Sequence, residues 1–227
     1  MKWMVYILVA ILCVIGFFLV KKRTPGIQQI LPEQCVFLMD EGLSKSFQTN
    51  ISSTITAAYG ASKDPQAVIA KVSQQYPEIS SMKVHLCKTD KICFLLDGQK
   101  PMFLLNGQSV VCDNDAVIEK DHFSSDIVDG LTRVTADGEQ NIPGMVRFFE
   151  KLPAAIKANF ETNWLSDSEI VLHEKNKQGE SFLVAVTQVP QEKDIELCRS
   201  IQDPVASKNK KKSITYDLRF NNQIIVR

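Results

Sequence analysis

Apolar residues follow several distinct patterns along this chain, and the first is a continuous run. Trp3 to Val20 contains no charged side chain. As a helix, these roughly 18 residues would rise about 27 Å, close to the roughly 30 Å hydrocarbon core of a bilayer. The run leads directly into Lys21-Lys22-Arg23-Thr24-Pro25, which lacks the small-residue cleavage site of a signal peptide. We therefore predict an uncleaved membrane anchor within residues 1–23.

The charges beside this anchor leave its orientation open. Lys2 and the amino terminus precede the apolar run, whereas Lys21, Lys22 and Arg23 follow it. The positive-inside rule would keep the following domain in the cytoplasm. Long domains, however, can be translocated largely regardless of charge. Topology therefore has to be decided by other features.

Beyond a linker expected at residues 24–32, where two prolines and a glycine occur, the pattern changes to short strands and amphipathic helices. Cys35–Met39 is a short apolar run that predicts a strand. Apolar residues at helical spacing predict a helix from about Ser44 to Tyr59, with Gly60 as its C-cap. A second helix is expected from Asp64-Pro65 up to Tyr76-Pro77.

A group of strands follows these two helices. Asn106-Gly107 is the strongest hairpin signal in the chain. A strand, two helices and a meander of strands would form a compact two-layer α+β unit, expected at residues 33–118. The expected strands of the meander are 79–87, 92–97, 101–105 and 108–112.

A second α+β unit with a mainly antiparallel sheet is expected at residues 119–227. Its pattern includes a helix from about Met145 to Phe160, which Pro153 should kink. A later helix should bury Ile195, Leu197, Cys198 and Ile201. Strands are expected at 168–173 and 181–189, and a final hairpin at 214–220 and 223–227.

Charge argues against a nucleic-acid partner. The chain has 26 Lys+Arg and 26 Asp+Glu, but four of the basic residues and none of the acidic ones lie in residues 1–23. The remainder is therefore mildly acidic, with 22 basic and 26 acidic residues. Nucleic-acid binding depends on basic surfaces that neutralise phosphates, so no such partner is expected.

The sequence contains no recognisable catalytic or cofactor motif. His85, His122 and His173 are scattered, and none belongs to an HExxH, GxSxG or Cys/His arrangement. No glycine-rich phosphate loop occurs. The five cysteines after the anchor include no CxxC pair or zinc-type cluster. We therefore expect no enzyme activity, cofactor, metal or small-molecule substrate.

Two of these cysteines are candidates for a disulfide. Cys87 and Cys93 fall on two expected strands joined by the short turn 88–91, so they would face each other if the domain lies outside the membrane. The alternative is that both are buried in their strands as small hydrophobic residues. The other three are Cys35, Cys112 and Cys198.

Two stretches of the chain resemble the cell-division protein family FtsQ/DivIB. Tyr76-Pro77-Glu78-Ile79-Ser80-Ser81-Met82-Lys83-Val84 resembles the entry into the second strand of a POTRA domain, the module beside the membrane anchor in that family. Pro101–Gly107 resembles the family's next segment, although Gln99-Lys100 stand where many members keep an acidic residue. The ending Tyr216–Arg227 resembles the last hairpin of the family's β domain. The chain departs from the family in its short N-terminal tail, Met1-Lys2.

This resemblance implies a divisome scaffold that crosses the inner (plasma) membrane once, with its large domain extracytoplasmic at the division septum. The implied partners are FtsB/DivIC-like and FtsL-like bitopic proteins and other divisome components. Physically, a terminal strand leaves an unpaired edge to which another chain can add a strand. The resemblance implies that the contact is carried by Phe220, Asn222, Gln223, Ile224, Ile225 and Val226.

Two alternatives remain open. Ile224 and Val226 could instead be core positions of the terminal strand. At the level of function, the alternative is a membrane-anchored interaction protein with a POTRA unit that serves secretion or envelope assembly rather than division.

Overall fold

A computed structural model describes residues 35–87, 91–137, 141–175, 180–206, 214–220 and 223–226, with only the backbone described at 202–206 and Gln223. The expected anchor at Trp3 to Val20 and the linker at 24–32 lie outside this part of the chain. None of its helices combines the length and the apolar character needed to cross a membrane. The described chain is a mixed α+β protein with six α-helices and two sheets.

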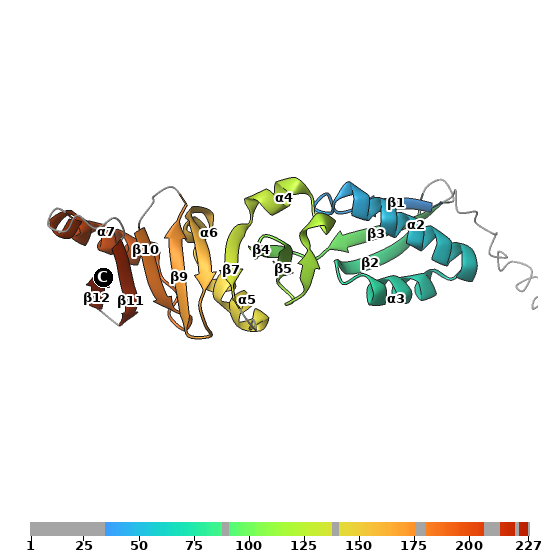
Figure 1. The fold of residues 1–227 in the computed structure, drawn as a ribbon. Coiled ribbons are helices and arrows are strands. Elements are labelled where there is room, and N and C mark those ends of the chain that lie inside the picture. The colour runs from blue at the N-terminus through green and yellow to red at the C-terminus, as the bar shows by residue number, and fades with distance from the viewer. Residues whose placement is uncertain are drawn as a thin grey trace, which may run out of the picture.

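The first sheet has three strands in the order β1-β3-β2. Strand β3 (Ile92–Gly98) is parallel to β1 (Cys35–Met39) and antiparallel to β2 (Ile79–Leu86). Helices α2 (Lys45–Ser62) and α3 (Pro65–Gln75) share one apolar core with these strands and lie at one end of the molecule (Figure 1). The predicted order of strand, helix, helix, strand and strand is confirmed.

The ends of these two helices follow from their capping residues. The Ser44 hydroxyl accepts a hydrogen bond from the backbone N–H of Phe47 at 3.3 Å, as expected for an N-cap. The prediction that Gly60 ends α2 was wrong. The helix continues to Ser62, and Lys63 adopts the left-handed conformation with φ 56°. Because Asp64 already caps α3, the chain has to reverse at Lys63.

The second sheet has nine strands in the order β12-β11-β10-β9-β8-β7-β4-β5-β6. Five of its eight described strand pairs are antiparallel. The strands are β4 (Pro101–Leu105), β5 (Ser109–Cys112), β6 (Val117–Glu119), β7 (Thr132–Ala136), β8 (Phe160–Trp164), β9 (Glu169–Glu174), β10 (Glu180–Ala185), β11 (Ile214–Phe220) and β12 (Gln223–Val226).

The expected four-stranded meander was wrong, because β4 and β5 belong to the nine-stranded sheet. Their hairpin itself is confirmed. Asn106 and Gly107 have φ 50° and 70°, and the N–H of Gln108 donates to the carbonyl of Leu105 at 3.1 Å. Strand β4 has apolar side chains on both faces, with Leu105 in the main core and Leu104 in a smaller cluster. A strand with two apolar faces has to be covered on both sides. In the expected two-layer unit, with helices on one face of the sheet, one apolar face of β4 would have been left uncovered.

Helices cover the nine-stranded sheet on both faces, but over different strands. Helices α5 (Ile142–Lys151), α6 (Ala154–Asn159) and α7 (Glu192–Ala206) contribute to the main core. On the opposite face, α4 (Ser125–Gly130) and the short 3-10 helix η2 (Lys120–His122) adjoin the smaller cluster over β4, β5 and β6.

Two details of these helices differ from the predictions. The helix expected around Met145 to Phe160 is two helices, because Pro153 lacks the N–H needed to continue the first. Leu197 was expected to be buried but is 54% exposed, whereas Ile195 and Cys198 are buried. Residues three apart share a helix face, and Leu197 points away from that face.

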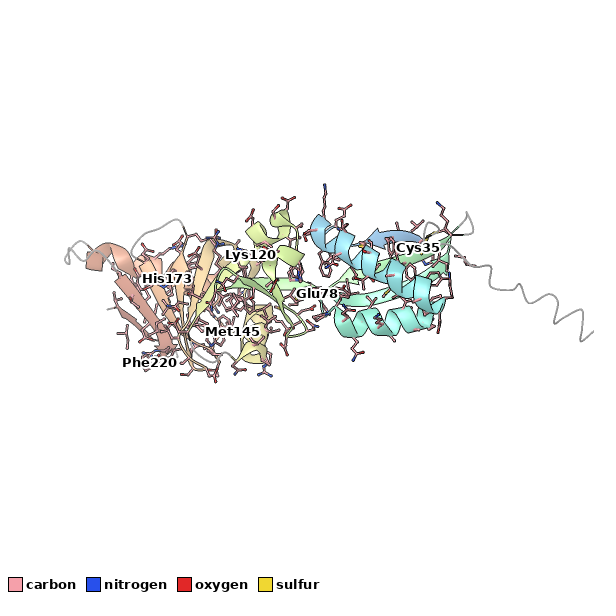
Figure 2. The ribbon with its side chains drawn as sticks, turned by 45° about the vertical axis from the view of Figure 1, so that its right-hand side comes forward. Cys35, Glu78, Lys120, Met145, His173 and Phe220 are labelled. Atoms are coloured by element: carbon pink, nitrogen blue, oxygen red, sulfur yellow. A yellow bond between two sulfur atoms is a disulfide. The ribbon has the colours of Figure 1, made fainter. Side chains whose placement is uncertain are left out.

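The two sheets meet around a buried carboxylate. The carboxylate of Glu78, which directly precedes β2, accepts a hydrogen bond from Nδ1 of His122 at 2.7 Å. The His122 ring stacks on the ring of Phe47 in α2, with centroids 4.8 Å apart. Figure 2 shows Glu78 between the two parts of the molecule. The backbone N–H of Ser44 also donates to the carbonyl of His122 at 2.9 Å, so the junction is closely packed.

We expect His122→Ala to lower the free energy of unfolding by about 2 kcal/mol, because it leaves a buried acceptor without its partner. Urea denaturation of the full chain would measure the change. His173→Ala is the matched control, since His173 is exposed on β9, and it should stay within about 0.5 kcal/mol of the wild type. Equal effects of the two substitutions would contradict a structural role for the Glu78–His122 pair.

The cysteines of the described residues fall into two groups. Cys87 and Cys93 are joined in a disulfide, with Cα atoms 5.8 Å apart. Cys35, Cys112 and Cys198 are free thiols. Burial raises the pKa of Cys112 to about 12, with smaller contributions from Asp113 and Glu78. Burial likewise raises the pKa of Cys198 to about 11.

We expect Cys112 and Cys198 to resist alkylation in the folded protein. At pH 8 a thiol with a pKa of about 12 is thiolate in only about one molecule in ten thousand, and the thiolate is the reactive form. Iodoacetamide treatment without reductant, followed by peptide mass spectrometry, should show Cys35 modified first, because it is only half-buried. Rapid labelling of Cys112 before unfolding would contradict this assignment.

Candidate protein-binding edge

Strand β12 forms one edge of the nine-stranded sheet. Within the described chain it pairs only with β11, so the N–H and C=O groups on its other side have no strand partner. This edge lies at the end of the molecule far from the three-stranded sheet (Figure 1). Figure 2 likewise places Phe220, beside β12, at the other end of the molecule from Cys35 of β1. The edge is therefore clear of the junction between the two sheets.

Helix α7 brings the last two strands to this position. Strand β11 runs parallel to β10, and a parallel neighbour requires a crossover connection. Helix α7 lies in this crossover and buries Ile195 and Cys198 in the main core. After β11 the chain reverses, and β12 returns antiparallel with Ile225 opposite Asp217. The sheet therefore ends with the C-terminal strand.

The predicted contact residues divide between the two faces of β12. Ile224 and Val226 pack against the main core, which supports the alternative that they are structural. Ile225 points to the other face and is 38% exposed, and Phe220 at the end of β11 is 45% exposed. Asn222 lies outside the described residues, and at Gln223 only the backbone is described.

Among the described residues, no helix of the main core lies over the face that carries Ile225 at this end of the sheet. We call the cross-strand row Val171, Leu183, Asp217 and Ile225, on β9 to β12, the open face. Its neighbours in sequence, such as Leu172, Phe182 and Tyr216, point into the core instead. Val171 and Leu183 are half-buried. The open face is therefore a mostly apolar strip beside the free edge.

Asp217 of the open face belongs to a hydrogen-bonded network of charged side chains with Arg219 and Glu169. Asp217 is fully buried, and Arg219 donates to its carboxylate from Nε at 2.8 Å and from Nη2 at 2.7 Å. The remaining amino group of Arg219 donates to Glu169 on β9. Glu169 is paired with Ala185 on β10, so the Arg219 side chain on β11 reaches across β10 to Glu169. These hydrogen bonds raise the pKa of Arg219, so the guanidinium stays charged.

The two parallel hydrogen bonds from Arg219 compensate the buried carboxylate of Asp217. A carboxylate without compensating donors is costly to bury, and a planar guanidinium supplies two parallel hydrogen bonds. The Arg219 guanidinium also lies 5.8 Å from the centre of the Phe220 ring. It therefore connects the buried charge to one of the two exposed apolar side chains at the edge.

Asp217, Arg219 and Glu169 were not among the contact residues predicted from the sequence. The pairing of Asp217 with Arg219 could have been predicted, since residues two apart on a strand share a face. Glu169 is 50 residues from Arg219, and only the strand order brings the two together. No sequence pattern indicated this contact.

We expect Arg219→Met to lower the urea midpoint of unfolding, because the Asp217 carboxylate loses both guanidinium donors. Arg133→Met is the matched control, since Arg133 is exposed on β7 and its loss should change little. Glu169→Gln should also have a small effect, because Glu169 is 38% exposed. The double variant Asp217→Asn/Arg219→Met should be more stable than Arg219→Met alone. An Arg133 effect as large as that of Arg219 would contradict this account.

The comparisons with known proteins do not add to these observations. No model of a protein family matches the chain, and no curated protein matches it. Any function assigned to the edge therefore depends on the residues and geometry described above.

Proposed function

We propose that this chain is a membrane-anchored, non-catalytic scaffold of the cell-division machinery. It binds FtsB/DivIC-like and FtsL-like single-pass proteins outside the membrane, at the division septum, by adding a strand of the partner to β12. The observation that carries this proposal is that β12 has no strand on its outer side among the described residues, with the exposed side chains of Phe220 and Ile225 beside it. The resemblance of the C-terminal hairpin to the FtsQ/DivIB family supplies the identity of the partners.

The two ends of the nine-stranded sheet differ in a way that favours β12 as the binding edge. Edge strands that do not bind partners are commonly very short or charged. Strand β6, at the other end, has three residues and ends in the charged Glu119. Strand β12 has the sequence Gln-Ile-Ile-Val and contains no charge. An uncharged β-branched edge is suited to pairing with another strand.

The length of β12 limits what backbone pairing alone can contribute. Strand β12 has four residues, and only alternate residues direct their hydrogen-bonding groups outward. Side chains next to the edge must therefore supply much of the affinity and specificity. Ile225, Leu183 and Val171 of the open face offer an apolar surface on which the partner's side chains can pack.

Two further features support an extracytoplasmic scaffold. The Cys87–Cys93 disulfide favours an oxidising compartment, since cytosolic thiols are normally kept reduced. The apolar run from Trp3 to Val20 would confine the protein and its bitopic partners to one membrane. Confinement raises their effective concentration, so a modest edge contact can be sufficient.

The test is a binding assay with the full chain in detergent micelles and the small single-pass coiled-coil division proteins of the same organism. Ile225→Asp should weaken binding by about tenfold or more, equivalent to ~1.4 kcal/mol. Phe220→Ala should weaken it in the same direction. The matched control is Val117→Asp, because Val117 is a similarly exposed apolar residue on β6, and binding should be unchanged.

A chain truncated before Asn221, which removes β12, should not bind at all. Circular dichroism and urea denaturation of each variant would separate lost contacts from lost folding. Binding that survives the truncation would place the partner contact elsewhere. Failure of every variant and of the wild type to bind would overturn the division scaffold itself.

A further inference from the structure

The hairpin of β2 and β3 gathers three metal-binding side chains at its end. His85 lies directly opposite Cys93 in the antiparallel register, and Cys87 follows His85 by two residues. Residues two apart on a strand share a face, so all three side chains project from the same side of the hairpin. One ligand atom from each, the imidazole nitrogen and the two sulfurs, lies within 4.8 Å of the others.

The backbone holds this arrangement in place. The N–H of Cys87 donates to the carbonyl of Lys91 at 2.8 Å, which continues the pairing beyond β2. Cys93 lies in the central strand of the sheet, with Val36 of β1 on one side and His85 on the other. Cys93 is fully buried, Cys87 is half-buried and His85 is exposed. The group is therefore fixed at its base and open to solvent at His85.

We propose that His85, Cys87 and Cys93 form a Zn²⁺ site when the disulfide is reduced. Two thiolates and one imidazole are the ligands that Zn²⁺ prefers, with bonds of about 2.3 Å to sulfur and about 2.0 Å to nitrogen. Tetrahedral geometry then separates the ligand atoms by about 3.5–3.8 Å, so the two sulfurs move apart once their bond is reduced. Water completes the fourth position on the exposed side.

The disulfide and the metal site are alternative ways of closing the same hairpin. A dithiol reduces the Cys87–Cys93 bond by giving two electrons and two protons, and is itself oxidised to a disulfide. Zn²⁺ then binds both sulfurs as thiolates and releases the two thiol protons to solvent. An oxidising compartment therefore favours the covalent bond, and a reducing one favours the metal.

The experiment uses the full chain in detergent micelles with Co²⁺ as a spectroscopic substitute for Zn²⁺. A phosphine, which takes up oxygen from water as it reduces the disulfide, is removed before anaerobic titration. We expect one Co²⁺ per chain, with thiolate-to-cobalt charge-transfer absorbance and tetrahedral d–d bands, and complete displacement by Zn²⁺. The oxidised chain should show neither signal.

Variants distinguish this site from binding by other cysteines. His85→Ala leaves the core and both sulfurs unchanged, and should weaken Co²⁺ binding by more than the about 10–100-fold typical of losing an outer-shell partner. Cys87→Ser should abolish the charge-transfer signal of the site. Cys35→Ser is the matched control, because Cys35 pairs with Ile92 and belongs to the opposite face of the sheet, and it should bind like the wild type. His173→Ala should do the same.

Three results would overturn the proposal. The first is the absence of Co²⁺ binding by the reduced wild-type chain. The second is equal affinity of His85→Ala and the wild type, which would exclude the imidazole as a ligand. The third is a thiolate signal that persists in Cys87→Ser but disappears in Cys35→Ser. Urea denaturation of the metal-free variants would show that each remains folded during the titration.

Discussion

The stacking of Phe182 on Tyr216 is the contact on which the C-terminal half of the sheet depends. The two rings are fully buried, lie in register on β10 and β11, and have centroids 5.2 Å apart. Because these strands are parallel and far apart in sequence, no turn sets their alignment. The ring pair and its core neighbours therefore fix the register. Strand β12 in turn takes its place from β11.

The cost of the wrong register shows why this contact matters. A slip of one residue would exchange the two faces of β11 and direct Asp217 and Arg219 into the apolar core. In the observed register, Asp217 is instead on the open face, where Arg219 can compensate its charge. The same alternation places Ile224 against the core and leaves Ile225 exposed. The core contact and the proposed binding surface are two consequences of one alignment.

Local signals in the sequence were sufficient for most elements but not for their assembly. The Asp64 cap and the Asn106-Gly107 turn were predictable because each acts over a few residues. The membership of β4 in the larger sheet depends on its pairing with β7, which no local pattern specifies. The edge residue Ile225 could be predicted from the alternation of a terminal strand. The Glu78–His122 pair spans 44 residues, so sequence spacing gave no signal for it.

The junction between the sheets determines how the two ends of the molecule are positioned relative to each other. Strand β3 ends at Gly98 and β4 begins at Pro101, so only two residues connect them. Both are held by backbone hydrogen bonds, because the N–H of Gln99 donates to the backbone carbonyl of Glu78 and the carbonyl of Lys100 accepts from the N–H of Asp113. Together with the buried carboxylate at this point, these bonds make the connection a packed contact and not a flexible linker. The β12 edge is therefore held at a set distance from the three-stranded sheet, which is the property that the proposed scaffold requires.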